Sequence, residues 1–351
     1  MNAEILQELV RNQKLNWSDL DSLRKKVAFR IGSVLGAWGL VLFLGLMFIT
    51  REIFSFLKSD FQANQDYETV LGMIAFLLFL YVLAGIIFNN RRKKLIYNYL
   101  LNGEYSNRYR NEVISKVIPA FMKNASYHPE EGISKSDFRK SGFPLFSNPT
   151  KYHSSGAIKG ELGKSEFVFA EVLAEELIDN ESTTQYSDIF RGVFFIVDFK
   201  KSTDWDTLIY PDAIKYFSHF LLGKLSEEKS FSEKNYRRVK LEDVEFEKHF
   251  EVYGTDQTES RYVLSTALMT RILDFKKKTK KNIQFSFKNS KVYFGIYASG
   301  KQGLFTPPLF GSVYNLKYLE SYINDIKLML SIIEELNLNS TLNLSQEKSA
   351  I

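Results

Sequence analysis

The sequence contains no cysteine, and this absence excludes several classes of protein at once. Without thiols the chain cannot hold a disulfide framework, a thiolate zinc site, an iron–sulfur cluster or a cysteine nucleophile. Only 4 of its 351 residues are histidine, which leaves little for an imidazole-rich metal site. Proline and glycine, at 7 and 19 residues, are too scarce for a low-complexity chain, whereas 30 Phe and 19 Tyr are enough for a sizeable core. The chain is therefore predicted to fold, and its length suggests about two structural units.

Charge is missing from two long stretches of the chain. Residues 31–49 and 70–88 contain no Asp, Glu, Lys or Arg. A helix of that length crosses about 30 Å of hydrocarbon, and a helix satisfies its own backbone groups in lipid. Both stretches are predicted to be transmembrane helices, joined by a short external loop over 50–69. The first lies too far from the N-terminus and lacks the cleavage site of a signal peptide, so we expect it to be retained.

Basic residues flank this predicted hairpin on its outer ends. They are Arg24, Lys25, Lys26 and Arg30 before the first span, and Arg91, Arg92, Lys93 and Lys94 after the second. The loop between the spans carries more acidic than basic residues. The positive-inside rule then places both termini in the cytoplasm in a multi-pass topology. The same basic residues could also contact anionic lipid head groups.

Small residues in the first span provide a candidate packing surface. Gly32 and Gly36 form a GxxxG pair, which lets helix backbones approach closely in a bilayer. The pair could pack the first span on the second or join two copies of the chain in a homo-oligomer. Neither span contains an ionisable residue that could carry a proton or an ion.

Hydrophobic periodicity divides the rest of the chain. Residues 1–30 are predicted to be helical, with a second helix capped by Ser18. Residues 89–156 are expected to form juxtamembrane helices followed by a loop. Residues 157–337 are expected to form the cytoplasmic domain, and 338–351 a polar, flexible tail.

The cytoplasmic domain is predicted to be α+β with an antiparallel sheet and packed helices, because its strand signals are grouped in hairpins. The expected strands are a hairpin over 157–172 turning at Gly163, a strand over 192–199, a strand over 244–253, and a hairpin formed by 283–287 and 291–297. One helix is expected from Asp256 to Leu273, with Asp256 and Glu259 spaced as in a capping box. A second, amphipathic helix is expected over 315–336.

Three sequence patterns are candidates for a phosphate-binding, metal-binding or catalytic site. The stretch GELGKS, from Gly160 to Ser165, has only two residues between its glycines and lies in a predicted hairpin, so it does not fit a phosphate loop. The histidines, His128, His153, His219 and His249, are scattered. Five aspartates are clustered but do not match the spacing of a calcium loop. These are Asp188, Asp198, Asp204, Asp206 and Asp212. We therefore expect no metal and no cofactor.

A basic run closes the predicted helix after Leu273. Its cations are Lys276, Lys277, Lys278, Lys280 and Lys281. Cations are favoured at a helix C-terminus, and this is one interpretation of the run. The other is contact with anionic lipid or a protein partner, and no nucleic-acid partner is expected.

The cytoplasmic half resembles a bacterial family of two-pass membrane proteins, domain of unknown function 3137. The matching stretches are IKGELGKSEFVFAEV at 158–172, FRGVFFIVDF at 190–199, LEDVEFEKHFEVYGTDQTESRYVLSTALMTRIL at 241–273, and the 285–297 hairpin followed by LFTPPLF at 304–310. The resemblance implies residence in the inner membrane and no assigned activity. It brings no catalytic residues to this chain.

These observations favour a non-enzymatic, membrane-anchored protein whose cytoplasmic domain is a binding or scaffold module for a protein partner or anionic lipid. The alternative is a membrane-tethered hydrolase or transferase that uses carboxylates such as Asp198, Asp204 and Asp206. In that case the carboxylates should converge in a pocket.

Overall fold

The computed structural model describes residues 2–59, 75–76, 79–89, 103–122, 124–143, 148–180, 183–199, 204–211, 236–298, 303–309 and 311–347. The chain divides into two compact units, which are considered separately below. The first comprises Met1–Gln13, Arg110–Phe305 and Tyr314–Ile351, and the second comprises Lys14–Tyr109 and Thr306–Val313.

The first unit is built on an antiparallel sheet of nine strands within the described residues, in the order β1-β2-β3-β4-β9-β8-β5-β7-β6. The strands are β1 (Ala125–His128), β2 (Lys151–Leu162), β3 (Ser165–Asn180), β4 (Thr183–Asp198), β5 (Thr207–Pro211), β6 (Arg237–Val239), β7 (Phe250–Gly254), β8 (Ile283–Lys288) and β9 (Lys291–Tyr297). The edge strands β1 and β6 are the shortest, which limits the exposed pairing edge.

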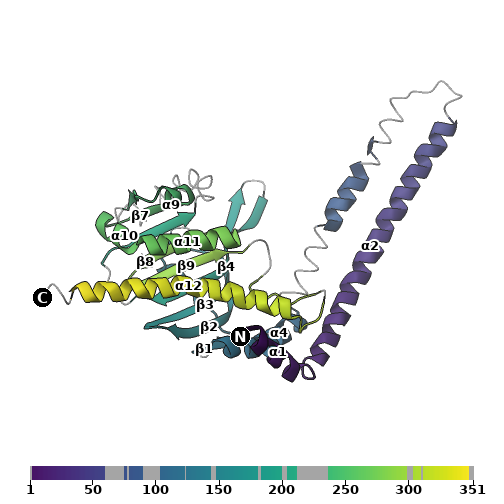
Figure 1. Cartoon of the computed structure of the whole chain (residues 1–351). Helices are drawn as coiled ribbons and strands as arrows, with labels where there is room; N and C mark the ends of the chain where they lie inside the picture. Colours follow the sequence, from purple (N-terminus) through teal and green to yellow (C-terminus); the bar gives the residue numbers. More distant parts are fainter. Residues whose placement is uncertain are drawn as a thin grey trace. The chain divides into compact units, whose positions relative to one another are not determined.

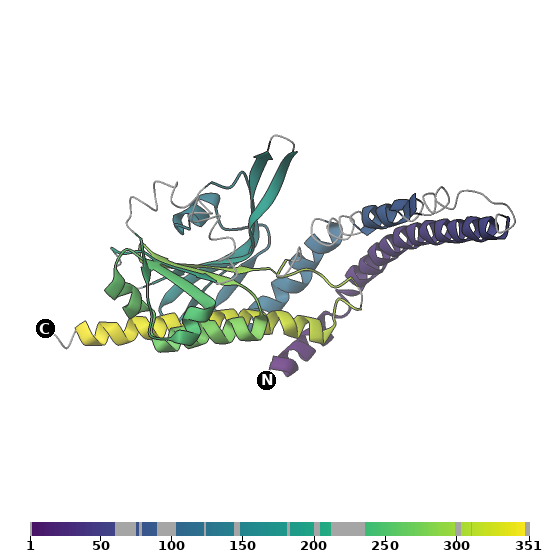
Figure 2. The ribbon, with the colours of Figure 1, turned by 90° about the horizontal axis from the view of Figure 1, so that it is seen from above.

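Helices cover one face of this sheet. They are α1 (Asn2–Gln13), the π-helical turn η2 (Arg110–Ile114), α5 (Ser115–Phe121), α9 (Val244–His249), α10 (Gln257–Val263), α11 (Thr266–Thr279) and α12 (Leu316–Glu347). Figures 1 and 2 show α11 and α12 running side by side across the strands. The short α1 packs against α12 and α5.

Phenylalanine rings fill the space under these helices. Phe169, Phe195, Phe294 and Phe285 face one another across β3, β4, β9 and β8, and each is at most 1% exposed. Successive ring centroids are 4.5, 4.2 and 5.3 Å apart. This row is the centre of the core on the helical face.

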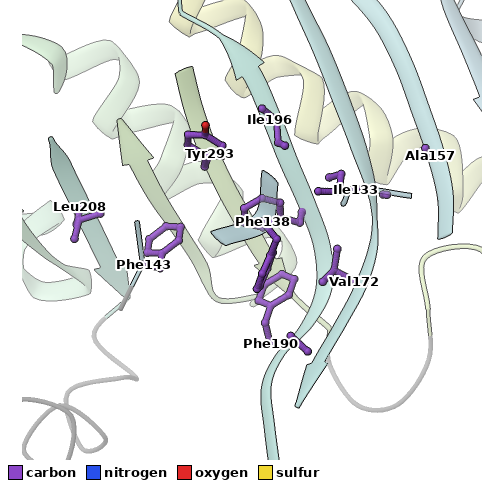
Figure 3. Packing of buried hydrophobic residues seen from close by; sticks show 12 residues of the cluster. Ile133, Phe138, Phe143, Ala157, Val172, Phe190, Ile196, Leu208 and Tyr293 are labelled. Carbon is purple, nitrogen blue, oxygen red and sulfur yellow. The ribbon is translucent and has the colours of Figure 1, made fainter. Parts of the chain in front are cut away.

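A second cluster lies on the opposite face, where the short helix α6 (Lys135–Lys140) packs on the sheet (Figure 3). Phe138 of α6 contacts the rings of Phe190 and Phe194, at centroid distances of 5.9 and 4.8 Å. Ser134 caps α6 by accepting a hydrogen bond from the Asp137 N–H at 3.0 Å. The cap therefore fixes α6 where its one buried side chain, Phe138, enters the cluster.

Most of the hairpin predictions are confirmed. The sheet is antiparallel throughout its described pairs, and β2 turns into β3 at Gly163, whose φ of 64° favours glycine. The β8–β9 turn places Asn289 and Ser290 at φ 51° and 57°, the left-handed conformations of a tight hairpin turn. The strand expected over 192–199 is the second half of β4.

The strand predicted over 244–253 is wrong in its first half. Residues Val244–His249 form α9, because Asp243 accepts a hydrogen bond from the Phe246 N–H at 2.9 Å and caps a helical turn. Glu245 then lies one turn from Lys248 and His249, at 3.6 Å from each. Only Phe246 is buried, stacked on Phe250 at the start of β7. Lys248 lies on the exposed side of this helix.

Three further differences concern helix boundaries and one missed strand. The helix expected from Asp256 to Leu273 is divided, because Ser265 caps a new helix, α11, directly after α10. The helix expected over 315–336 continues to Glu347 as α12. The segment before the sheet, expected to be a loop with short helical pieces, contains the short helix α6 and also an unpredicted strand, β1.

The second unit contains the long helix α2 (Ser18–Ser59) and the short α4 (Glu104–Tyr109). Within the described residues, Ser18–Arg51 is the one helix long and apolar enough to cross a membrane; its most apolar stretch of 18 residues has a mean hydropathy of 2.1. The second expected span, 70–88, falls partly outside the described residues. Its described part belongs to a shorter apolar helix, Phe79–Asn89.

A buried ion pair lies near the N-terminus of α2. Arg24 donates to Asp21 at 2.9 Å and to the Leu309 carbonyl at 3.0 Å, and the Val313 N–H donates to Asp21. Tyr105 of α4 donates to the Pro308 carbonyl at 2.7 Å. Together these bonds hold the loop 306–313 against α2 and α4. Arg24 is therefore engaged within the protein, although its sequence position suggested a cation at the lipid surface.

Candidate functional site

An open cleft of about 830 Å³ lies on the α6 face of the sheet. Residues of β1, β2, β3, β4 and β9 form its floor, and the segment from Gly132 to Asp137 forms one wall. A volume of this order is typical of ligand-binding clefts.

The floor of the cleft is one row of directly opposed residues. Ser126 is paired with Lys159, Lys159 with Val168, and Val168 with Ile196. The next residue in the row is Tyr293, opposite Ile196. Since opposed residues lie on the same face, the row places polar groups at its β1 end and apolar groups at its centre.

Ion pairs surround this floor. Lys291 lies 2.5 Å from Asp198, and Lys140 lies 2.7 Å from Asp137. The hydrogen bonds from Lys140 and Ser134 hold the pKa of Asp137 below its ordinary value of 3.8. Burial raises the pKa of Tyr293 to about 12, and the carboxylates of Asp137 and Asp198 act in the same direction. At neutral pH the Asp137 carboxyl is therefore ionised, while the Tyr293 phenol is neutral.

Two glutamates lie opposite each other at the end of the cleft nearest the β2–β3 turn. Glu161 of β2 is paired with Glu166 of β3, and both line the cleft. Neither side chain has a hydrogen bond or an ion pair to another described residue. Like charges directly opposed in a sheet are unfavourable, so this end of the cleft carries uncompensated negative charge.

Three of the five clustered aspartates pair with separate cations, and Asp204 is exposed. Asp198 pairs with Lys291, Asp206 with Lys288 at 3.1 Å, and Asp188 with Arg191 at 2.7 Å. Asp212 lies outside the described residues. Among the residues that the structure describes, no three His, Asp or Glu side chains are placed to share a metal ion.

Three cations of the predicted basic run have partners on the domain itself. Lys276 donates to the His249 carbonyl at 3.1 Å and lies over the Phe250 ring at 4.8 Å. Lys277 lies 3.3 Å from Glu245, and Lys281 lies 3.5 Å from Asp325. Lys278 is the last of the basic residues in the final turn of α11, and Lys280 adopts a left-handed conformation as its C-cap. The other basic residues predicted to contact lipid, Arg91 to Lys94, lie outside the described residues.

The glycine candidates and His249 do not form a site in the described structure. Gly160 and Gly163 lie in the β2–β3 hairpin, which agrees with the exclusion of a phosphate loop. His219 lies outside the described residues, and His249 lies 3.6 Å from Glu245 on α9. Gly32 and Gly36 are exposed on α2, and a Cβ at either position would meet no atom within 4 Å.

Sequence reasoning missed the cleft because its residues come from five strands and one short helix. Ser126 and Asp137 lie in a segment that was expected to be a loop. The alternation of Ser126 and His128, followed by Pro129, was the only local sign of a strand and turn there. The remaining floor residues become neighbours only through the strand register.

Residues 188–338 match a family model described as "Protein of unknown function (DUF3137)". No curated protein and no solved structure matches the chain. The matched part begins in β4 and ends in α12, so it supports a domain of unknown function in the second half of the chain. The stretch 158–172, which contributed to the resemblance seen in the sequence, lies outside this match. The cleft therefore combines matched residues, such as Ile196 and Lys291, with unmatched ones, such as Ser126 and Lys159.

Proposed function

We propose that the protein is an inner-membrane protein with two spans and cytoplasmic termini, whose α+β domain binds a segment of a protein partner in the cleft. The observation that carries the proposal is the cleft itself: an apolar floor at Val168 and Ile196 with an ionised rim, on a chain that also has a membrane-length helix. An apolar centre with a polar rim is the usual anatomy of a protein interface.

Two observations on α2 support a second span. Leu35, Leu42, Gly45 and Ile49 are less exposed than the residues between them, and their spacing places them on one side of the helix. Trp38 also lies 6.2 Å from Phe88, measured between ring centroids. A partly covered side and an aromatic contact are what a helical hairpin requires.

The absence of cysteine makes the topology directly testable. Single cysteines at Asn12, Asn64 and Ser321 should be labelled by a membrane-impermeant maleimide in different ways. Asn64→Cys is expected to react in intact cells or spheroplasts, and the other two only after the membrane is opened. Labelling of all three from one side would contradict the two-span topology.

The partner-binding proposal is tested by a photo-crosslinking amino acid placed in the membrane-embedded protein. Val168, on the cleft floor, is the test position, and Tyr262, which is 45% exposed on α10, is the matched control. We expect one discrete protein adduct from position 168 that is absent from position 262. An Ile196→Asp substitution should remove the adduct by placing a charge on the apolar floor.

Two results would overturn this proposal. Identical products from both positions would mean that the cleft is no binding site. Adducts with lipid alone would assign the domain to the membrane surface, and binding to anionic vesicles that depends on Lys278 and Lys280 would support that assignment.

A further inference from the structure

Three side chains at the β1 end of the cleft are linked in sequence by one hydrogen bond and one ion pair. Ser126 Oγ lies 2.8 Å from His128 Nε2, and His128 Nδ1 lies 3.2 Å from Glu131 Oε1. Ser126 itself lines the cleft. Each of the two imidazole nitrogens thus has one partner, a hydroxyl on one side and a carboxylate on the other.

Local backbone geometry produces this arrangement. Ser126 and His128 are two residues apart on β1, so their side chains lie on the same face of the sheet. The chain then turns at Pro129 and Glu130, and the Glu131 N–H donates to the His128 carbonyl at 3.3 Å. The turn brings the Glu131 carboxylate back to the imidazole.

Lys159 keeps the Glu131 carboxylate in its charged form. Its ammonium lies 2.5 Å from Glu131 Oε2 and, together with His128, holds the pKa of Glu131 below its ordinary value of 4.5. The ionised carboxylate favours the imidazole tautomer with hydrogen on Nδ1. Nε2 is then left as the acceptor for the Ser126 hydroxyl.

We propose that Ser126, His128 and Glu131 act as nucleophile, general base and orienting carboxylate in the hydrolysis of an acyl ester. The order of contacts, serine to Nε2 and carboxylate to Nδ1, is the one that nucleophilic catalysis by serine requires. Lys159, directly opposite Ser126 in the sheet, supplies positive charge beside the developing oxyanion.

The reaction is balanced by the ester and water alone. Ser126 Oγ bonds to the ester carbonyl carbon while its proton passes to His128 Nε2. The bond from carbon to the alcohol oxygen breaks, and that oxygen takes the proton from Nε2. Water, deprotonated by the same nitrogen, then attacks the acyl-serine, releases the carboxylic acid and restores the Ser126 hydroxyl.

The floor of the cleft indicates the substrate class. Val168 lies two strands from Ser126 in the same row, a separation of about 10 Å, and Ile196 lies one strand further. An acyl chain extending from Ser126 across this row would cover both apolar side chains. The structure therefore favours esters with an acyl chain of several carbons over acetyl esters.

The experiment uses the full-length protein purified in dodecyl maltoside, with p-nitrophenyl hexanoate, p-nitrophenyl acetate and a fluorophosphonate label. We expect label on the wild type and on Ser321→Ala, an exposed serine of α12, and none on Ser126→Ala. His128→Gln should lower hexanoate hydrolysis about 100-fold. Glu131→Gln and Lys159→Met should each lower it about tenfold.

Several results would overturn the assignment. These are a wild type that takes no label and hydrolyses the esters no faster than Ser126→Ala, or label that remains on Ser126→Ala. Because Ser126 is exposed, its alanine variant should keep the wild-type unfolding midpoint, so a loss of labelling would report chemistry and not folding. The crosslinking from position 168 does not depend on the Ser126 hydroxyl, so Ser126→Ala also separates this proposal from the partner-binding one.

Discussion

The two faces of the sheet differ, although the same strands build both. On the helical face, Phe195 of β4 lies between the rings of Phe169 and Phe294 and is completely buried. One residue further along, Ile196 points to the opposite face, where it lines the open cleft. A step of one residue therefore separates the centre of the core from the floor of the candidate site.

This difference indicates how the fold separates stability from recognition. The ring row on the helical face excludes solvent from four adjacent strands. Among the described residues, the opposite face is covered where α6 places Phe138 against Phe190 and Phe194, and the cleft lies along the row from Ser126 to Ile196. We infer that substitutions on the helical face change stability, whereas those on the cleft floor change binding.

The difference between the two faces can be tested first by truncating the adjacent residues Phe195 and Ile196. Phe195→Ala should lower the free energy of unfolding by about 4 kcal/mol, because it leaves a large cavity within the ring row. Ile196→Ala should cost about 2 kcal/mol, because its side chain is smaller and borders the cleft, although it is only 9% exposed. Urea unfolding of the two variants in detergent measures the difference, and equal losses would contradict the division between the faces.

A second pair of substitutions compares the two lysines at the ends of the β8–β9 turn. Lys288 pairs with Asp206 where both side chains are largely buried, at 15% and 9% exposure, whereas Lys291 pairs with Asp198 at 43% and 30%. Lys288→Met removes the cation beside the buried Asp206 carboxylate, which keeps its hydrogen bond from the Tyr236 hydroxyl, and should cost about 3 kcal/mol. Lys291→Met should cost less than about 1 kcal/mol.

The same unfolding measurement tests this pair, with an internal check. Adding Asp206→Asn to Lys288→Met should recover part of the lost stability, because the buried negative charge of Asp206 is then absent. A cost for Lys291→Met as large as that for Lys288→Met would mean that the rim of the cleft is as structural as the buried pair.

Local sequence signals predicted the hairpins, because a turn such as Gly163 or Asn289–Ser290 and an alternating strand lie within a few residues of each other. The same alternation gave a wrong strand prediction at 244–249. There the Asp243 cap and the spacing of Glu245, Lys248 and His249 suit a helical turn equally well. Only the burial of Phe246 against Phe250 distinguishes the two, and this contact is tertiary.

The candidate site could not be predicted in the same way. Its floor joins Ser126, Lys159, Val168 and Ile196, which are separated by as many as 70 residues and meet only through three strand registers. A change of one residue in any register would place different side chains on the floor. The Ser126–His128–Glu131 chain is local, but its contacts depend on the turn after β1.

A third prediction tests how tightly the closed part of the α6 face is packed. A Cβ at Gly295 would lie 2.7 Å from the ring of Phe190, so Gly295→Ala should cost about 1–3 kcal/mol through overpacking. Phe190→Leu in the same chain should relieve part of that cost. If Gly295→Ala alone is neutral in urea unfolding, the α6 face is looser at this point than the buried ring implies.

The smallest expected effect is a pH dependence at the N-terminus of α6. Hydrogen bonds from Lys140 and Ser134 lower the pKa of Asp137 below 3.8, so the ionised group stabilises the folded chain above that pH. The contribution disappears as the pH falls from about 3.8 through the lowered pKa, because the protonated carboxyl no longer attracts Lys140. The difference in unfolding free energy between wild type and Asp137→Asn should be less than about 1 kcal/mol at pH 7 and should shrink below pH 4. Phe195→Ala removes no ionised group, so the stability that it costs should change little over the same pH range. A constant difference for Asp137→Asn would mean that α6 is held to the sheet by Phe138 alone.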